Sequence, residues 1–288
     1  MENSRPRFLD FLKLLRCRGW VKNAFVFSGL FFSTQFGDWR LTGAAILIFI
    51  QFCVLSSAVY CFNDIQDRHA DAEHPQKKLR PIPSGRVSVS EAYVLCLVLV
   101  AITAALCIAE PRSIFFLLAY LVVNVAYTLK LKETVILDVF LISFGFLLRI
   151  LIGTYPLGIV PSRWLLFCGF SITFFISLSK RFLEYNINFS QHAKARKVLN
   201  EYNLEFLKLA LGAVFAQTLI GYALYISESK SVWIYLSLFP ALYGMLTYLL
   251  LVTKSRIIDD PVKIITTSRE IFVSVLVWIA LFVCHIYF

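Results

Sequence analysis

The chain has 288 residues, of which 59% are hydrophobic and only 16% are charged, and its formal net charge is +10. Soluble domains carry roughly 25% charged residues, whereas long apolar segments recur along this chain. The composition therefore excludes an ordinary soluble protein and predicts a protein that crosses a membrane several times. The seven Cys residues include no CxxC pair, which argues against a disulfide framework and against a structural zinc site.

The predicted elements are helices throughout. Residues 5–22 alternate cations with Phe and Leu, which is typical of a short helix at the membrane surface, so 1–20 is assigned as a cytoplasmic, interfacial N-terminal segment. The two longest polar segments are 61–87 and 180–202. Nine apolar spans are predicted, at about 21–36, 41–60, 88–109, 113–129, 135–153, 164–179, 204–227, 231–253 and 271–288.

The distribution of positive charge predicts the orientation of these spans. Loops on one side of the membrane carry most of the 28 Lys and Arg residues. The positive-inside rule therefore predicts that the N-terminus, 61–87 and 180–202 face the cytoplasm of a bacterial inner membrane. Because topology accounts for most of the basic charge, no nucleic-acid partner is expected. The remaining cations are Arg149, which lies within a span, and four on the opposite side of the membrane, Arg40, Arg112, Arg163 and Lys230.

The most polar run of the chain is NDIQDRHADAEHPQKKLRPIPSG, residues 63–85. Asp64, Asp67 and Asp71 are spaced so that a helix would place them on one face, and Asn63 can join them. Clustered carboxylates beside cations predict a site for a hard divalent cation with a di- or triphosphate. The alternative is a solvated loop whose charges serve solubility and topology. The cations that follow the carboxylates are Lys77, Lys78 and Arg80.

A second polar group surrounds the turn before the fifth span, with Tyr127, Lys130, Lys132 and Asp138. Arg149 lies eleven residues after Asp138, about three helical turns, so the two share a helix face. An Arg within a span costs about 2.5–3.5 kcal/mol even on insertion scales. We therefore expect Arg149 to face a polar cavity, where it binds either an anionic ligand or an acidic side chain.

A third polar group, Lys180, Arg181 and Glu184, closes the sixth span. On a helix, Glu184 can pair with either cation. In the functional interpretation, Glu184 holds one cation and the other faces a phosphate. In the alternative, the group is an ion pair at a helix end with additional topological charge.

The pattern Asn63-Asp64-x-x-Asp67-x-x-x-Asp71 resembles the first Asp-rich motif of the UbiA superfamily of intramembrane prenyltransferases. The resemblance covers essentially the whole chain. It implies one transferase domain over 1–288, an all-α bundle of about nine transmembrane helices with a polar cavity that faces the cytoplasm. Most members have a second motif with paired Asp residues, whereas the corresponding turn here, YTLKLKETVILDV, has only Asp138. This departure argues against a standard aromatic prenyltransferase.

The chain is more similar to one branch, the decaprenyl-phosphate phosphoribosyltransferases. This resemblance implies Mg²⁺-dependent transfer of a phosphoribosyl group from 5-phosphoribosyl 1-pyrophosphate to a polyprenyl phosphate, for the synthesis of arabinose donors of the cell envelope. The features that carry it are Trp20-Val21-Lys22-Asn23, His74-Pro75-x-Lys77-x-x-Arg80, Tyr127-x-x-x-x-Lys132, Asp138-Val139, Gly145-Phe146-x-Leu148-Arg149 and Lys180-Arg181-x-x-Glu184.

The resemblance also implies roles for the polar residues. The catalytic candidates are Asp64, Asp67, Asp71 and Asp138, and the candidate Mg²⁺ ligands are Asn63, Asp64, Asp67 and Asp71. The candidates for substrate binding are Lys22, Asn23, Lys77, Arg80, Tyr127, Lys130, Lys132, Arg149, Lys180, Arg181 and Glu184.

Two other functions compete with this one. The first is an aromatic prenyltransferase that uses a polyprenyl diphosphate, and the second is a transporter of a phosphorylated lipid or anion, since basic residues within a bundle serve transport as well. The clustered Asp residues favour metal–diphosphate chemistry over transport. Association into a homo-oligomer is left open by the sequence.

Overall fold

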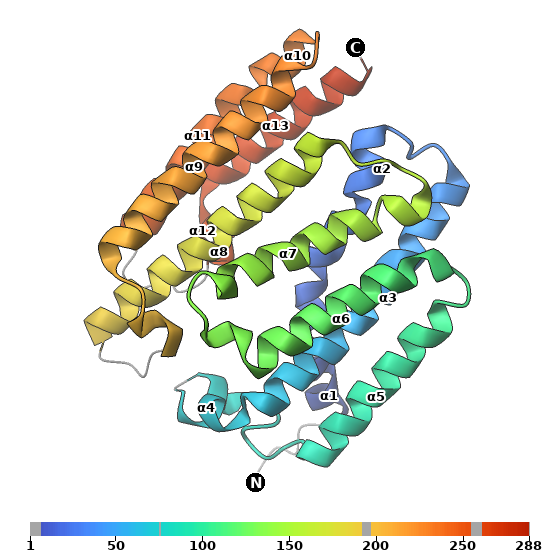
Figure 1. Cartoon of the computed structure of the whole chain (residues 1–288), viewed down its shortest axis with the longest axis vertical. Coiled ribbons are helices and arrows are strands. Elements are labelled where there is room, and N and C mark those ends of the chain that lie inside the picture. The colour runs from blue at the N-terminus through green and yellow to red at the C-terminus, as the bar shows by residue number, and fades with distance from the viewer. Residues whose placement is uncertain (1–6, 75, 192–196, 255–260, 288) are drawn as a thin grey trace. The chain divides into compact units, whose positions relative to one another are not determined.

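A computed structural model describes residues 7–74, 76–191, 197–254 and 261–287. Within these ranges every regular element is a helix (Figure 1), so the predicted all-α fold is confirmed. Among the residues that the structure describes, eight segments are long and apolar enough to cross a membrane. They are formed by α3 (Trp39–Gln66), α5 (Val89–Leu106), α6 (Ile114–Leu129), α7 (Leu137–Ile152), most of α8 (Arg163–Gln191), α9 (Leu204–Ser227), α10 with α11 (Val232–Leu236 and Leu238–Lys254) and most of α13 (Arg269–Tyr287).

The predicted span 21–36 has a different form. Its residues wind into a long 3₁₀ helix, η1 (Cys17–Phe27), followed by the short helix α2 (Ser28–Ser33). Two glycines allow this segment to touch another backbone closely. A Cβ added at Gly153 would lie 1.8 Å from the Val26 carbonyl oxygen, and one added at Gly29 would lie 2.3 Å from the carbonyl oxygen of Gly153. With this segment counted, the prediction of about nine helical spans agrees with the structure.

Local chemistry explains where several helices begin and end. The Asp38 carboxylate caps α3 by accepting the Arg40 and Leu41 N–H groups, and Ser88 forms a capping box with Glu91 at the start of α5. Between α10 and α11 the helix is interrupted at Ser237, because Pro240 has no N–H for the carbonyl four residues earlier. The remaining elements are α1 (Arg7–Leu15), α4 (Arg68–Glu73), η2 (Lys77–Leu79), η3 (Pro111–Ser113), η4 (Leu131–Glu133), η5 (Tyr155–Leu157), η6 (Lys197–Asn200) and α12 (Pro261–Thr267).

Two polar segments are more helical than predicted. The segment 61–87 begins inside α3, which continues to Gln66 and is followed almost directly by α4. The segment 180–202 begins inside α8, which continues to Gln191, while residues 192–196 lie outside the described part of the chain. Polar residues without Pro or Gly continue a helix readily when they pair one turn apart, so polarity alone misplaced both helix ends.

The chain forms two compact units. The first comprises residues 1–131 and 147–161, and the second comprises 132–146 and 162–288. The helix α7 therefore contributes its first turns to the second unit and its last turns to the first. Function as one transferase domain over 1–288 stays a prediction.

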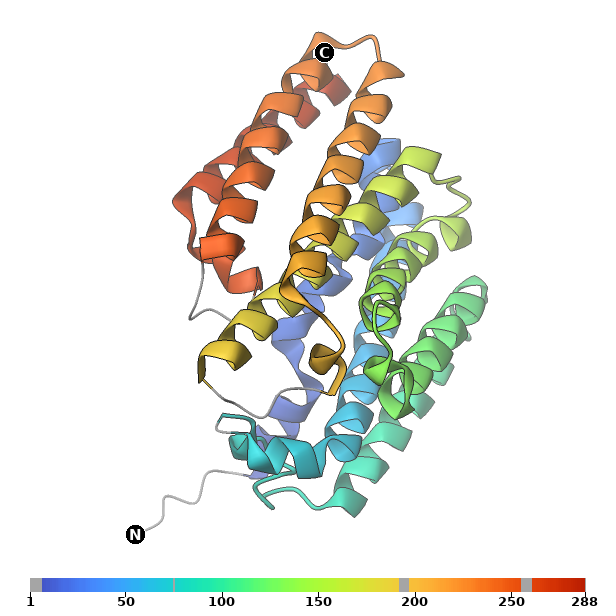
Figure 2. The ribbon, with the colours of Figure 1, turned by 60° about the vertical axis from the view of Figure 1, so that its left-hand side comes forward.

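In the first unit, α3 packs against α5, α6 and η1 (Figures 1 and 2). A buried cluster that includes Leu14, Cys61, Ile65 and Ile82 lies beside the end of α3. This packing fixes the helix end on which the Asp-rich motif begins, because the buried residues come from α1, from α3 and from the loop that follows α4.

In the second unit, α8 packs against α9, and α11 packs against α13 (Figure 2). Its core contains Val139 of α7, Leu178 and Phe182 of α8, and Tyr202. Two charged residues of this unit, Asp138 and Arg181, are also buried.

Candidate functional site

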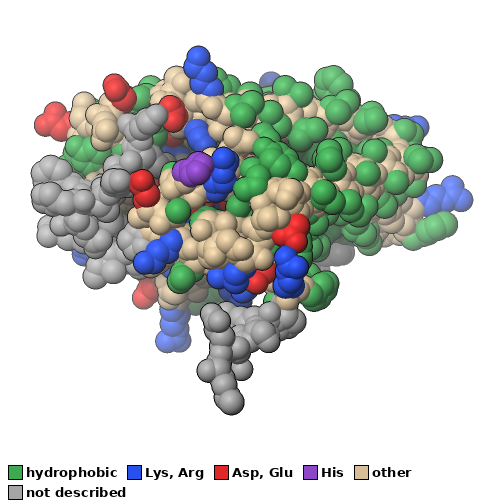
Figure 3. Space-filling view, turned by 90° about the horizontal axis from the view of Figure 1, so that it is seen from below, with side chains coloured by type: hydrophobic (Ala, Val, Ile, Leu, Met, Phe, Trp, Pro, Cys, Tyr) green, Lys and Arg blue, Asp and Glu red, His purple; other side chains and the backbone are tan. Residues whose placement is uncertain are grey.

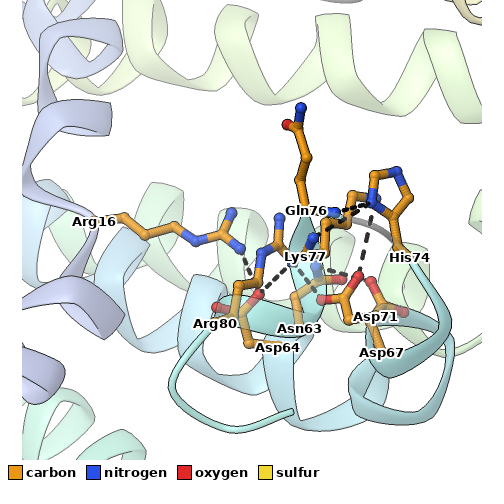
Figure 4. Close-up of polar contacts among 9 residues, drawn as sticks. All are labelled: Arg16, Asn63, Asp64, Asp67, Asp71, His74, Gln76, Lys77 and Arg80. Carbon is orange, nitrogen blue, oxygen red and sulfur yellow. Dashed lines mark hydrogen bonds and ion pairs between the residues drawn. The ribbon is translucent and has the colours of Figure 1, made fainter. Parts of the chain in front are cut away.

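The Asp-rich motif spans the end of α3 and all of α4. Asp64 lies on the last turn of α3, Asp67 lies at the junction, and Asp71 lies on α4. The backbone stays nearly helical across the junction, because the Asp67 N–H donates to Asn63 O at 2.9 Å and the Asp71 N–H donates to Asp67 O at 2.8 Å. The side chains of Asn63 and of the three Asp residues accordingly project towards the same side (Figure 4), as their spacing predicted.

Arg80 bridges two of these carboxylates. Its Nη1 lies 3.1 Å from Asp64 Oδ1 and makes a short hydrogen bond with Asp71. Both carboxylates are buried, with Asp64 2% and Asp71 4% exposed. Lys77 Nζ lies 3.9 Å from Asp71 Oδ1. Lys77 and Arg80, two of the cations that follow the Asp-rich motif in sequence, are therefore in contact with it. The buried carboxylates are paired with positive charge.

The loop after α4 brings Arg80 and Lys77 to the carboxylates. His74 accepts the backbone N–H groups of Gln76 and Lys77 on Nδ1, at 3.2 and 3.3 Å. The chain then turns through Gly85, whose φ of +74° favours glycine. Pro75, part of the resemblance at this point, lies outside the described residues. The short Pro-rich turn thus folds the cations back over the acidic helix.

Asn63 connects the motif to α6. Its Nδ2 donates to Asp67 Oδ2 at 3.2 Å, and its Oδ1 accepts a hydrogen bond from Thr128 Oγ1 at 3.2 Å. Tyr127, which is half-buried, directly precedes Thr128, and Lys130, which is exposed, follows it by two residues. The end of α6 therefore borders the Asp-rich motif, while a role of Tyr127 and Lys130 in binding stays a prediction.

Arg16 is part of this group, and the sequence analysis did not single it out. It makes a short hydrogen bond with Asp64, and its guanidinium carbon lies 5.3 Å from the centre of the Tyr60 ring. Its backbone is left-handed, with φ of +50°, where α1 ends and η1 begins. In the sequence it is one of several cations in an amphipathic segment, and no local pattern connects it to a carboxylate 48 positions away.

The donor chemistry of the motif fits a hard divalent cation, because Asn63, Asp64, Asp67 and Asp71 supply only oxygen ligands on this side. Within the described residues, no three His, Cys, Asp or Glu side chains already converge at the spacing of a metal site. Arg80 and Arg16 contact the carboxylates instead. A cation at this position would exchange some of these arginine contacts for its own.

Arg149 is also in the first unit, and its pocket is polar and aromatic. Its Nε donates to Asn23 Oδ1 at 3.0 Å and its Nη2 donates to Tyr120 Oη at 3.2 Å. Its guanidinium carbon lies 4.8 Å from the Phe52 ring centre. Asn23 is held in turn by Ser56 Oγ at 3.1 Å. Two predicted binding residues, Asn23 and Arg149, are thus in contact, and the buried cation is stabilised by neutral oxygens and by aromatic faces.

The second unit contains a further buried charged group. Arg181 Nε donates to Asp138 Oδ2 at 2.5 Å, and Arg181 Nη1 makes a short hydrogen bond with Glu184. Asp138 is fully buried and Arg181 is 1% exposed. Lys180, the neighbouring cation, is half-buried. Glu184 therefore pairs with Arg181, which is one of the pairings that the sequence allowed.

Tyr202 completes this group and was also missed by the sequence analysis. Its Oη donates to Asp138 Oδ1 at 2.9 Å. Burial raises the pKa of the Tyr202 hydroxyl well above its usual range, and the adjacent Asp138 carboxylate acts in the same direction. The hydroxyl therefore remains a neutral donor at physiological pH. The separation of 64 positions leaves no local signal for this contact.

The other predicted cations are nearer the surface. Lys22 is exposed, and Lys132, which belongs to the second unit, is half-buried. One face of the molecule, drawn in Figure 3, carries acidic and basic side chains over part of its area and hydrophobic side chains over the rest. Lys22 and Lys132 stay predicted binding residues.

The profile of the UbiA prenyltransferase family matches residues 23–269. The chain belongs to the UbiA prenyltransferase family. It is 29% identical over 249 residues to a decaprenyl-phosphate phosphoribosyltransferase of Corynebacterium glutamicum, covering 82% of this chain and 75% of that one. It is 26% identical over 294 residues to the protein of the same name from Mycolicibacterium smegmatis, covering 96% and 92%.

The fold of this UbiA-family chain agrees with solved structures. A UbiA homolog from Archaeoglobus fulgidus bound to DMAPP and Mg²⁺ superimposes with a TM-score of 0.72 at 16% sequence identity, covering 95% of this chain and 99% of that one. The predicted UbiA-like helical fold is therefore confirmed. Family membership and the eight candidate spans also confirm that the chain is a multi-pass membrane protein and a transferase.

Proposed function

We propose that this enzyme transfers a 5-phosphoribosyl group from phosphoribosyl pyrophosphate to a polyprenyl phosphate of the decaprenyl type and releases pyrophosphate. The observation that carries the proposal is the mixed charge of the first unit, where Asp64 and Asp71 are bridged by Arg80 and flanked by Arg16 and Lys77. Such an array suits a donor that carries several phosphate charges. The decaprenyl-phosphate phosphoribosyltransferases among the relatives support the same choice.

Asn63, Asp64, Asp67 and Asp71 would hold Mg²⁺, which supplies charge neutralisation to a departing pyrophosphate when it is bound. The four side chains project towards the same side of the α3–α4 junction (Figure 4). The UbiA homologs of Archaeoglobus fulgidus bound to DMAPP or GPP with Mg²⁺ have the same fold, which supports a divalent cation for this fold.

The cations of the first unit would bind the donor by exchanging partners. Arg80 is 30% exposed at its side chain while its carboxylate partners are buried, so its outer part can reach a ligand that arrives from solvent. A bidentate contact from a guanidinium to a phosphate is as favourable as one to a carboxylate. Arg16, Lys77 and Arg80 would then neutralise the pyrophosphate or the 5-phosphate of the ribose.

The proposed transfer breaks the bond between ribose C1 and a pyrophosphate oxygen and forms a bond between C1 and an oxygen of the acceptor phosphate. The electron pair of the broken bond leaves with pyrophosphate, and C1 acquires positive character as that bond lengthens. The acceptor phosphate is already an anion, so it needs little help from a general base. A single displacement of this kind inverts the configuration at C1.

The acceptor phosphate would be bound by cations among Lys22, Lys130, Lys132, Arg149, Lys180 and Arg181. Arg181 is held by Asp138 and Glu184 and is 1% exposed, which favours Lys180 as the member of that pair that contacts phosphate. Tyr127 and Asn23 would complete the polar lining. Asp138 has a protein partner on each oxygen, which favours a contribution to turnover through Arg181.

The location of the site follows from the charge distribution. The N-terminus, 61–87 and 180–202 would face the cytoplasm of a bacterial inner membrane, where phosphoribosyl pyrophosphate is available, and the cavity would open to that side. The isoprenoid tail would lie in the lipid bilayer. The product, a polyprenyl-phosphate ribose 5-phosphate, would be a precursor of arabinose donors for envelope glycans.

A transfer assay on purified protein tests the proposal. Labelled phosphoribosyl pyrophosphate, a polyprenyl phosphate and Mg²⁺ should give a labelled lipid, and EDTA should abolish its formation. If no product forms but a prenyl diphosphate is transferred to 4-hydroxybenzoate, the enzyme is an aromatic prenyltransferase. If folded protein is inactive in both assays, uptake of a labelled lipid phosphate into vesicles would identify a transporter instead.

A further inference from the structure

Tyr202 joins two parts of the second unit through a single hydroxyl group. Its Oη donates to Asp138 Oδ1 at 2.9 Å and accepts the backbone N–H of Ile136 at 2.8 Å. The other oxygen of Asp138 accepts Arg181 Nε at 2.5 Å. We propose that Tyr202 is a positioning residue for the transfer reaction, which orients Asp138 and, through it, the Arg181 turn of α8. The inference rests on the proposed function, in which this turn holds the acceptor phosphate.

The charge of the group explains why a neutral donor matters. Asp138 and Glu184 together carry two negative charges, and both contact the single guanidinium of Arg181. Asp138 is fully buried, so water cannot stabilise the charge of its carboxylate. The Tyr202 hydroxyl stabilises that charge and directs the carboxylate towards Arg181, because a hydrogen bond to a buried charge is stronger than one between neutral groups.

The backbone before α7 depends on the same hydroxyl. Ile136 has φ of +67°, which is rare for a β-branched residue and persists only where the surroundings enforce it. Its side chain is 47% exposed, so packing of that side chain contributes little to holding it. The hydrogen bond from the Ile136 N–H to Tyr202 connects this turn to the core, in addition to the local bonds from the Leu137 N–H to Val135 O at 2.7 Å and from the Asp138 N–H to Thr134 O at 3.1 Å.

The ring of Tyr202 is held independently of its hydroxyl. The ring stacks on Phe206 at 6.1 Å between centroids, and Tyr202 is 4% exposed within the core. Asn203 caps α9 by accepting the Phe206 N–H at 2.7 Å, while Val198 and Leu199 are buried just before it. A phenylalanine at position 202 would keep these contacts, so the substitution removes the hydroxyl without removing the anchor.

The test compares Tyr202→Phe with Tyr248→Phe in the purified full-length protein. Tyr248 is a matched control because it is 5% exposed in the same core and packs by its ring against Phe175 at 5.5 Å. We expect Tyr202→Phe to lower kcat about tenfold while KM for both substrates changes by less than about twofold, since alignment and not ground-state binding is lost. Tyr248→Phe should retain the wild-type kcat and KM.

A double-mutant cycle separates positioning from general stability. In an Asp138→Asn background, the further change Tyr202→Phe should lower kcat by less than about twofold, because the carboxylate that it orients is absent. Hydrogen exchange gives a readout that needs no turnover, and the amide of Ile136 should exchange faster in Tyr202→Phe than in Tyr248→Phe.

The outcomes are distinct. Equal kinetics of the two Tyr→Phe variants, or a tenfold loss that persists in the Asp138→Asn background, would overturn the positioning role. Faster exchange at Ile136 with unchanged kinetics would show that Tyr202 only maintains the turn, and would overturn it as well. A folded wild-type protein with no phosphoribosyl transfer would instead overturn the proposed function, and this inference with it.

Discussion

Replacing Arg80 by Met tests how the Asp-rich motif is held together. Met keeps a similar apolar stem but removes the guanidinium that contacts Asp64 at 3.1 Å and pairs closely with Asp71. Breaking a fully buried pair costs about 3–5 kcal/mol. Because the Arg80 side chain is 30% exposed and Asp64 keeps Arg16, solvent and the remaining partner reduce the expected loss to about 2 kcal/mol.

The assay is thermal unfolding in detergent, with Lys78→Met, an exposed neighbour in η2, as the control. A loss of about 2 kcal/mol corresponds to a decrease in Tm of about 4–8 °C for a chain of this size, while the control should change Tm by less than about 1 °C. Adding Asp71→Asn to Arg80→Met should restore part of the loss, because the amide has no charge to compensate. Mg²⁺ should raise the Tm of Arg80→Met more than that of the wild type, since a cation among the carboxylates replaces the missing charge.

Two results would refute this reasoning. If Arg80→Met unfolds at the wild-type temperature, the bridge between Asp64 and Asp71 contributes nothing to folding. If Asp71→Asn restores no stability in the Arg80→Met background, the loss does not arise from uncompensated charge. A Tm of Arg80→Met that is insensitive to Mg²⁺ would argue against a cation at this position.

Three further predictions concern the motif, the packing and the pH dependence. Asp67→Ala should abolish transfer while the protein still inserts into membranes, and retained activity would remove Asp67 from the metal site. Gly153→Ala should destabilise the fold by about 3 kcal/mol or more, because its Cβ would lie 1.8 Å from the Val26 carbonyl oxygen. Gly212→Ala, at a helix position with open space around it, should instead stabilise the fold by about 0.5–1 kcal/mol. Equal Tm values for the two variants would contradict this prediction. Burial acts to raise the pKa of Asp10, but hydrogen bonds and charges from two basic side chains outweigh it and lower that pKa. The Asp10 carboxylate therefore stabilises the fold above its unfolded pKa of about 3.9, and this stabilisation is lost as pH falls through the lower folded pKa. Asp10→Asn should flatten this acid dependence of Tm, and an unchanged dependence would contradict the prediction.

Much of the fold was predictable because a membrane limits the choices. Long apolar segments must form helices there, since no water is available to satisfy the backbone, and this reasoning located the eight spanning segments. The same reasoning did not predict the form of 21–36, where a 3₁₀ helix and a short α-helix form in place of one long α-helix. Hydropathy reports which residues avoid water, and it is blind to the close approach of the Val26 backbone to Gly153 that shapes this segment.

The candidate site also combines features that the sequence predicts with contacts that it does not predict. The sequence by itself determined which residues share a helix face, so Asn63 and its three following Asp residues were grouped correctly from their spacing (Figure 4). Only the tertiary structure decided that Arg16 contacts Asp64 and that Tyr202 contacts Asp138. Helical periodicity relates residues within a turn or two of one another. The residues of these two pairs are 48 and 64 positions apart and meet only because their elements pack together, so no local sequence pattern predicts their contact.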